Sequence, residues 1–226
     1  MTTIKTNKKG ALKMKVLGIS CSPRKNHTTD QLVKEVLGAV EMETEFISLA
    51  GLNIGPCIAC LGCVKDNVCK VKDDMQSIRK KIVDADAYVI GAPNYFSMLN
   101  GLAHCFLERF YQFRHREGKD VAGKLAIAVG TGGSDGKPVI NNLKMLLQYN
   151  QIECVGEVSA QGAACCFSCG YGETCKVGAI HMFFGEGTKI TTEIIPDLSK
   201  QPDKIELAHD LGKKLTERLN GFASAT

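Results

Sequence analysis

Four cysteines lie within thirteen residues, in the segment PCIACLGCVKDNVC, at the spacing C-x2-C-x2-C-x5-C. A compact run of this kind is typical of the ligands of a 4Fe-4S cluster, whereas structural zinc sites usually pair two C-x2-C units across roughly a dozen or more residues. Gly55, Pro56 and Gly62 interrupt any regular element, so we expect the thiols on a loop. The segment predicts a 4Fe-4S cluster, with a zinc site and disulfides or free thiols as the alternatives. The predicted ligands are Cys57, Cys60, Cys63 and Cys69.

A second group of cysteines occurs further along the chain, in the segment GAACCFSCGYGETC. Three of its thiols repeat the C-x2-C-x5-C spacing that ends the first motif, but Ala163 stands where the first cysteine would be. A second cluster would therefore need Cys165 or another residue, such as His181, as its fourth ligand. A metal site, a redox-active or substrate-binding thiol group, and structural thiols all remain open for this group. Its members are Cys165, Cys166, Cys169 and Cys175.

A polar loop, CSPRKNH, separates an apolar run from a helical pattern that begins near Thr28. Hydroxyl groups, one arginine and the free amides at the start of a helix are suited to bind a phosphate. The loop is not a Walker A motif, because G-x4-G-K-[ST] is missing. The alternative is an ordinary polar turn before a helix capped by Thr28 and Gln31. The candidate phosphate ligands are Ser22, Arg24, Thr28 and Thr29.

Apolar runs alternate with amphipathic stretches from Met14 onward, which is the pattern of a parallel sheet covered on both faces. The expected strands are 15–20, 44–49, 86–92, 124–130 and 152–158. The expected helices are 28–40, 73–85, 99–113, one that starts at Pro138, and 202–219. This pattern predicts an α/β, flavodoxin-like five-stranded parallel sheet, whose ligand lies at the carboxyl ends of the strands. We assign residues 1–13 to a basic flexible tail and residues 14–226 to this domain, with a cluster loop at 55–73 and a Cys-rich insertion at 160–190.

Two further loops at expected strand ends are suited to bind a flat ring. Pro93 is expected to end a strand, and Asn94, Tyr95 and Phe96 then offer an amide and two aromatic faces. The glycines of GTGGSDG do not match G-x-G-x-x-G, so a dinucleotide fingerprint is disfavoured. These glycines instead allow backbone amides to approach a ligand, unless the loop is simply flexible.

The motifs GISCSPRK, Cys57 to Cys69, GAPNYF and GTGGSDG occur in order over residues 14–158, and together they resemble the iron-sulfur flavoproteins of the flavodoxin-like FMN reductases. The resemblance implies an FMN phosphate in the first loop and an isoalloxazine ring against the other two, with the first four cysteines holding the cluster. It also implies a homodimer or homotetramer in which flavin and cluster meet across a subunit contact. The implied phosphate ligands are Ser22, Arg24, Asn26, Thr28 and Thr29. The implied ring contacts are Pro93, Asn94, Tyr95, Phe96, Thr131, Gly132, Gly133 and Ser134.

FMN transfers one or two electrons and a 4Fe-4S cluster transfers one, so the pair would convert between the two kinds of chemistry. The chain is therefore interpreted as an electron-transfer oxidoreductase that needs no catalytic side chain. Ferredoxin or NAD(P)H is the expected donor, and a small molecule is the expected acceptor. The alternative is an FMN-dependent NAD(P)H:quinone or FMN reductase with redox or zinc-binding cysteines and no cluster.

The composition agrees with a cytoplasmic location. Four lysines in the first thirteen residues account for the net charge of +4, which leaves a neutral body with no expected affinity for nucleic acid. We expect neither a membrane span nor a secretory signal, because no apolar run is long enough. Eleven cysteines are then expected to bind metal or to act in redox chemistry in a reducing compartment.

Overall fold

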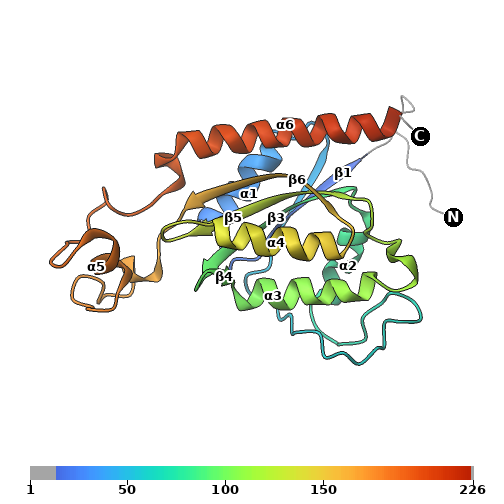
Figure 1. Cartoon of the computed structure of the whole chain (residues 1–226), viewed down its shortest axis with the longest axis horizontal. Coiled ribbons are helices and arrows are strands. Elements are labelled where there is room, and N and C mark those ends of the chain that lie inside the picture. The colour runs from blue at the N-terminus through green and yellow to red at the C-terminus, as the bar shows by residue number, and fades with distance from the viewer. Residues whose placement is uncertain (1–13, 225–226) are drawn as a thin grey trace.

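Five parallel strands form the central sheet of the computed structural model, which describes residues 14–224 (Figure 1). They are β1 (Lys15–Ser20), β2 (Glu43–Ser48), β3 (Ala87–Tyr95), β5 (Leu125–Gly132) and β6 (Glu153–Gln161). Their order across the sheet is β2-β1-β3-β5-β6, and every pair among them is parallel. The carboxyl ends of all five strands therefore lie at one edge, which confirms the predicted fold class.

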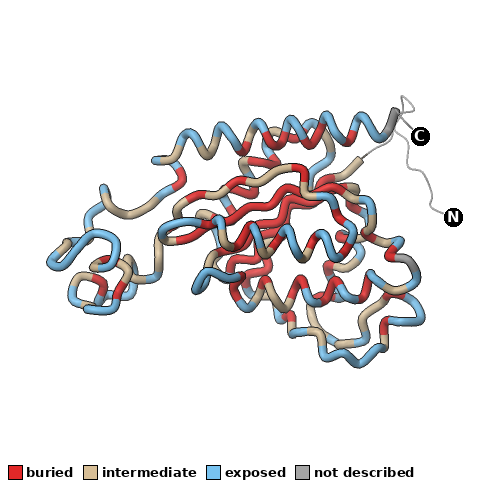
Figure 2. Tube along the Cα trace, in the orientation of Figure 1, coloured by how far each residue is buried: buried red, intermediate tan, exposed pale blue. Residues whose placement is uncertain are grey.

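Helices cover both faces of the sheet. The helices α1 (Thr28–Gly38) and α6 (Pro202–Ser224) pack on one face, and α2 (Met75–Asp84), α3 (Gly101–Glu108) and α4 (Lys137–Tyr149) pack on the other. Each helix buries one apolar stripe, such as Leu32, Val33 and Val36 of α1. The central strands are buried along nearly their whole length (Figure 2), because helices lie on both sides of them.

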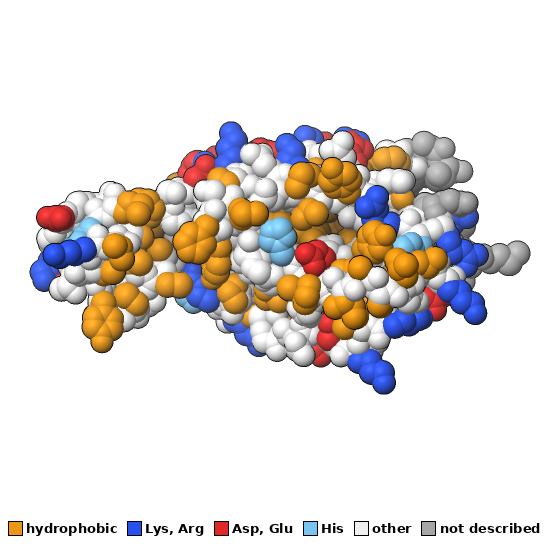
Figure 3. Space-filling model, turned by 60° about the horizontal axis from the view of Figure 1, so that its bottom comes forward, with side chains coloured by type: hydrophobic (Ala, Val, Ile, Leu, Met, Phe, Trp, Pro, Cys, Tyr) orange, Lys and Arg blue, Asp and Glu red, His pale blue; other side chains and the backbone are white. Residues whose placement is uncertain are grey.

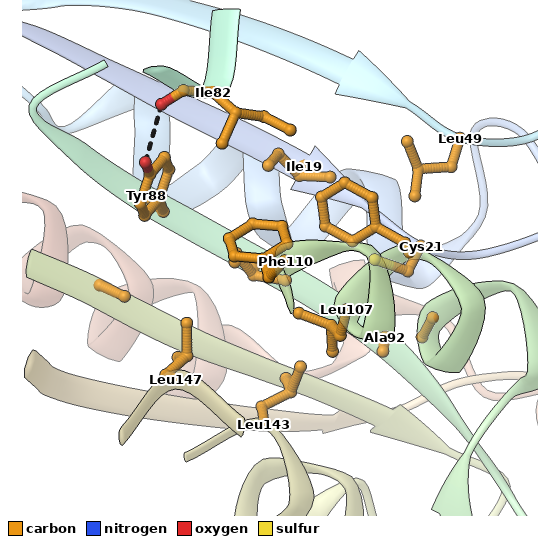
Figure 4. Close-up of a cluster of buried hydrophobic side chains, with 14 of the residues drawn as sticks. Ile19, Cys21, Leu49, Ile82, Tyr88, Ala92, Leu107, Phe110, Leu143 and Leu147 are labelled. Carbon is orange, nitrogen blue, oxygen red and sulfur yellow. Dashed lines mark hydrogen bonds between the residues drawn. The ribbon is translucent and has the colours of Figure 1, made fainter. Parts of the chain in front are cut away.

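The larger of the two buried clusters lies under α2, α3 and α4 (Figure 4). The rings of Phe106, Phe110 and Phe113 meet edge to face, with centroid separations of 5.2 and 5.3 Å. The buried Tyr88 hydroxyl donates to the Ile82 carbonyl at 2.7 Å, so its polar group is satisfied. This packing fixes α3, the helix that runs from the carboxyl edge of the sheet toward the first cysteine motif.

Two predicted boundaries are wrong for the same local reason. The third strand does not end at Pro93 but continues to Tyr95, and a two-residue turn at Phe96 and Ser97 joins it to the short antiparallel strand β4 (Met98–Leu99). The φ angles of the two turn residues are +55° and +62°, as a type I′ hairpin requires. Because β4 uses the residues expected to start the next helix, α3 begins only at Gly101. The end of that expected helix is a separate 3-10 turn (Arg109–Phe113).

A segment of irregular chain, residues 162–201, connects β6 to α6 beyond the carboxyl edge of the sheet (Figure 1). It contains 3-10 turns at Cys165–Phe167 and Leu198–Lys200 and the short helix α5 (Ala179–Phe184). A further 3-10 turn, Arg116–Gly118, precedes β5. The predicted basic tail, 1–13, lies outside the described residues. Among the described helices, none has the length and apolar character needed to cross a membrane.

Candidate functional site

A cavity of about 570 Å³ opens at the carboxyl edge of the sheet. Its walls come from the loops that follow β1, β3, β5 and β6, together with α5. This is the place at which an open parallel sheet usually binds a ligand. Eleven of the predicted flavin contacts line it: Arg24, Thr28, Thr29, Pro93, Asn94, Tyr95, Phe96, Thr131, Gly132, Gly133 and Ser134.

The loop after β1 is shaped by the two predicted residues that do not line the cavity. The buried Ser22 hydroxyl donates to the Arg24 carbonyl and accepts from the Arg24 amide, both at 3.1 Å. Asn26 has a φ of +60°, and its amide donates to the Asp30 carboxylate at 2.8 Å. Both contacts hold the chain in the turn that leads into α1.

The start of α1 has no side-chain cap. The cap position is His27 and not Thr28, which is already the first helical residue, and the His27 side chain makes no capping hydrogen bond, so the expected capping box is not at the helix start. The first amides of a helix carry partial positive charge and need acceptors. Because His27, Thr28 and Thr29 line the cavity, those amides are well placed to bind an anion there.

Hydrogen bonds join the loops around the cavity to one another. The hydroxyls of Thr29 and Thr131 lie 2.6 Å apart, which connects the start of α1 to the end of β5. The Asn94 side-chain amide donates to the Asp135 carbonyl at 2.8 Å, and Gln161 donates to the Gly133 carbonyl at 2.7 Å. These bonds pre-organise the cavity walls and so lower the entropic cost of binding a ligand.

A buried acceptor in the cavity wall has no partner among the residues that the structure describes. The side-chain oxygen of Asn94 is buried and accepts no hydrogen bond among the described residues, although its nitrogen is bonded. An unpaired buried acceptor costs about 1–3 kcal/mol, which a ligand N–H would recover. The imide N–H of a flavin ring is a donor of this kind, and Tyr95 and Phe96 supply aromatic surface next to it. The wall therefore fits an FMN ring.

The segment after β6 contributes wall residues that sequence reasoning did not assign to the cavity. They are Gly162, Ala163, Ala164, Cys165, Cys166, Ala179, Met182 and Phe183, and Ser97 of the hairpin is a further addition. Arg24 donates to the Ala163 carbonyl at 3.0 Å and so ties this segment to the first loop. The unusual cysteine content of the segment was a signal of function, but only the fold shows that it covers the cavity.

The first cysteine motif lies on a loop along α3 and the 3-10 turn that follows it. The amide of Cys57 donates to Glu108 at 3.1 Å, and the amide of Cys69 donates to Gln112 at 3.0 Å. The Sγ of Cys63 lies 3.2 Å from Nε2 of His115. The sequence did not predict that Glu108, Gln112 or His115 contacts the motif, because these residues are distant from it in the chain.

The other three thiols of this loop lie near Cys63, but the four do not converge on one point. Burial raises the pKa of Cys63, and the nearby Cys69, Cys57 and Cys60 raise it further, so all four lie within electrostatic range. Nevertheless, in the described part of the chain no three His, Cys, Asp or Glu side chains are close enough to hold a metal ion. The donor set fits a thiophilic metal centre, and the side chains must turn inward to bind one.

A buried ion pair connects the loop of the first cysteine motif to the body of the protein. The guanidinium of Arg109 donates to Asp73, with 3.1 Å between Nη2 and Oδ1, and also to the Gly55 carbonyl at 3.1 Å. Burial raises the pKa of Asp73, but Arg109 and the Gly55 amide lower it more, so the pKa lies below its ordinary value. Burial lowers the pKa of Arg109, but Asp73 and the neighbouring Cys69 raise it by more. The pKa of Arg109 therefore lies above its ordinary value. A fixed cation therefore lies beside Cys69.

The cavity and the cysteine loop occupy opposite ends of α3. Asn100, just before α3, donates to the Cys21 carbonyl on the cavity side, whereas Glu108 at its end accepts from Cys57. Eight residues of helix between them span about 12 Å. None of the first four cysteines lines the cavity. The cavity and the first cysteine motif are therefore separate regions of the chain.

Comparison with known proteins agrees with this geometry. The model of the family described as NADPH-dependent FMN reductase matches residues 14–164. An iron-sulfur flavoprotein of Methanocaldococcus jannaschii is 39% identical over 124 residues, which are 54% of this chain and 63% of that protein. An iron-sulfur flavoprotein of Methanosarcina thermophila is 29% identical over 124 residues, 54% of this chain and 64% of that protein. The match thus spans less than two thirds of either relative.

The fold is also similar to that of a solved flavodoxin from the domain Archaea. Its TM-score is 0.51 at 11% identity, and the alignment covers 92% of this chain and 99% of the flavodoxin. At this identity the likeness concerns the arrangement of strands and helices alone. It agrees with the strand order of the sheet.

Proposed function

The chain belongs to the family of NADPH-dependent FMN reductases, and from this premise we propose that it is an iron-sulfur flavoprotein, an oxidoreductase that couples FMN to a 4Fe-4S cluster. The observation that carries the proposal is the cavity at the carboxyl edge, whose walls contain eleven predicted flavin contacts. The names of the M. jannaschii and M. thermophila relatives support the cluster.

In the proposed complex, Arg24 and the amides at the start of α1 bind the FMN phosphate. Arg24 supplies the charge, while Thr28 and Thr29 supply hydroxyl groups. Asn94 accepts a hydrogen bond from the ring, and Tyr95 and Phe96 present aromatic faces to it. FMN, when bound, supplies one-electron and two-electron transfer. The residues of the chain bind and orient it and exclude water, and none is needed as a nucleophile.

The first cysteine motif would hold the cluster through Cys57, Cys60, Cys63 and Cys69. The buried guanidinium of Arg109 would offset part of the negative charge of four thiolates. All eleven cysteines lie in the described region and are free thiols, which favours a reducing, cytoplasmic setting. Ferredoxin or NAD(P)H as donor and a small molecule as acceptor complete the proposal.

We further propose that the protein is a homodimer or homotetramer. A groove of about 340 Å³ lies beside the cysteine loop and is lined by apolar groups that include Leu61, Tyr111 and Tyr149. Figure 3 shows hydrophobic side chains on this side of the body and on the lobe that carries α5. Association through such a surface would shorten the path for electrons between the flavin cavity of one subunit and the cluster of another. Light scattering after size-exclusion chromatography measures the mass directly.

The decisive experiment is anaerobic purification followed by quantification of FMN, iron, sulfide and zinc. The wild type is expected to contain FMN, iron and sulfide. The Cys60→Ala variant should lose most of the iron bound by the first motif and keep its FMN, and the Cys105→Ala variant, altered on α3, should keep both. Iron that survives in full in Cys60→Ala would refute the ligand assignment.

The same experiment tests a second candidate, an FMN-dependent NAD(P)H:quinone or FMN reductase without a cluster. One contact favours this candidate: Cys63 and His115 lie 3.2 Å apart, and zinc accepts mixed sulfur and nitrogen ligands. Zinc with FMN and no iron would establish it. If FMN were missing even after reconstitution, both candidates would fail.

A further inference from the structure

We propose that Cys166, Cys169 and Cys175 form a second thiolate-ligated metal centre at the edge of the cavity. These three residues lie in one folded loop between β6 and α5. Their C-x2-C-x5-C spacing repeats that of Cys60, Cys63 and Cys69. The metal is a thiophilic one, either iron in a cluster or zinc. The proposed centre is separate from the first motif, which lies at the far end of α3.

Two backbone amides already point at sulfur atoms of this loop. The amide of Tyr171 donates to Sγ of Cys169 at 3.4 Å, across Gly170, whose φ is +82°. The amide of Ala179 donates to Sγ of Cys166 at 3.3 Å. Amide donors stabilise a thiolate more than a thiol, and hydrogen bonds to sulfur are a regular feature of iron-sulfur sites. Glycine permits the positive φ that brings the Tyr171 amide back to its acceptor.

The third cysteine joins the same small region. A Cβ placed on Gly178 would lie 3.3 Å from Sγ of Cys175. The next residue, Ala179, is the one whose amide donates to Sγ of Cys166. Cys166 and Cys175 therefore flank one dipeptide. The amide of Cys175 donates to the Tyr171 carbonyl at 3.0 Å, which closes the loop between the second and third thiols.

The side chains retain the freedom to converge. Cys169 is exposed, and Cys166 and Cys175 are half-buried. As they stand, these thiols are among the described groups that are not close enough to hold an ion. Rotation about χ1 from one staggered position to the next moves a sulfur atom by about 3 Å. A disulfide needs only two of the three thiols, whereas a metal centre accounts for all three and for the amide donors.

The position of the centre connects it to the cavity. Cys166 lines the cavity, and α5, which follows the third thiol, contributes Met182 and Phe183 to the same wall. Phe183 also packs over the loop after β5, since a Cβ on Gly133 would lie 3.3 Å from its ring. The metal would therefore fix the wall that covers the ligand. This last consequence, but not metal binding itself, rests on the proposed binding of FMN.

The test starts from the full chain carrying Cys60→Ala and Cys63→Ala, which disables the first motif. This protein is reconstituted anaerobically, in one arm with ferrous iron and sulfide and in the other with zinc chloride, then desalted and analysed for metal and FMN. It is expected to retain metal in one of the two arms, which identifies the metal. Adding Cys169→Ala should lower the apparent metal affinity by more than about tenfold, the lower bound for disturbing even an outer partner of a metal site. Adding Cys105→Ala instead is the matched control and should change nothing.

Two results would overturn the proposal. One is metal binding that Cys169→Ala leaves unchanged, and the other is no metal in either arm although circular dichroism shows a folded chain. The FMN content separates this failure from a failure of the proposed function. If the parent variant holds metal and the added Cys169→Ala change removes it while FMN is retained, the second centre is supported. Metal that the parent variant holds in the absence of FMN would support the centre while removing its role at a flavin cavity.

Discussion

Replacing Arg109 by methionine should release the cysteine loop from the body of the protein. The guanidinium is fully buried and holds both Asp73 and the Gly55 carbonyl. Methionine fills a similar volume but has no charge and no donor. The Asp73 carboxylate would keep the amides of Gly55, at 3.0 Å, and Met75, at 3.2 Å, but would lose its cation.

The magnitude follows from the burial of the pair. Removing one partner of a buried ion pair costs about 3–5 kcal/mol, because the remaining charge is left uncompensated. The two amide bonds to Asp73 survive, so we expect the lower end, about 3 kcal/mol. The double variant Arg109→Met with Asp73→Asn carries no buried charge and should recover all but roughly 1–2 kcal/mol.

Urea unfolding of the metal-free protein under anaerobic conditions measures these free energies, and iron retained after gel filtration reports on the loop. Arg218→Met is the matched control, since Arg218 forms an exposed pair with Glu153 and should contribute less than about 1 kcal/mol. A loss below about 1 kcal/mol in Arg109→Met, or no recovery in the double variant, would refute the reasoning. Unchanged iron retention would show that the pair supports the fold without supporting the metal site.

Three other changes probe the cavity and the sheet. Arg24→Ala should weaken FMN binding by about 1.5–3 kcal/mol, because a charged hydrogen bond is lost. Fluorescence titration measures the FMN affinity, with Lys25→Ala as the control. Equal affinities in Arg24→Ala and the wild type would show that Arg24 does not bind the phosphate. Ser97→Gly should raise the free energy of unfolding by roughly 1 kcal/mol, because glycine adopts the φ of +62° without strain; a decrease in denaturation experiments would contradict this. Burial lowers the pKa of Lys124 from 10.5 to about 8. Between these two pH values the unfolded chain binds a proton that the folded chain does not. The free energy of unfolding should therefore rise with pH across this range, by up to roughly 3 kcal/mol. Denaturation across that range should show a smaller rise in Lys124→Met than in the wild type, and equal slopes would disprove the assignment.

Local sequence was sufficient for the sheet and for most of the cavity. Continuous apolar runs such as β5 identify strands buried on both faces, and the residues that follow them must gather at one edge if the strands are parallel. For this reason the loops that contain Arg24, Asn94 and Thr131 were expected at one edge, and the resemblance to the FMN reductases assigned these three residues to one site. The hairpin at Phe96 was not predicted, because its turn lacks the glycine or asparagine that usually signals positive φ.

The spacing of the cysteines predicts which thiols form one ligand set, since ligand spacing is a property of the chain alone, and this assignment stays a prediction. The tertiary structure decided what surrounds each group. It placed Arg109, Asp73 and His115 beside the first motif, and it brought Cys165 and Cys166 of the second group to the wall of the cavity. The physical reason is that these contacts are made by side chains brought together when helices pack on the sheet. No periodicity or spacing along the sequence records such long-range packing.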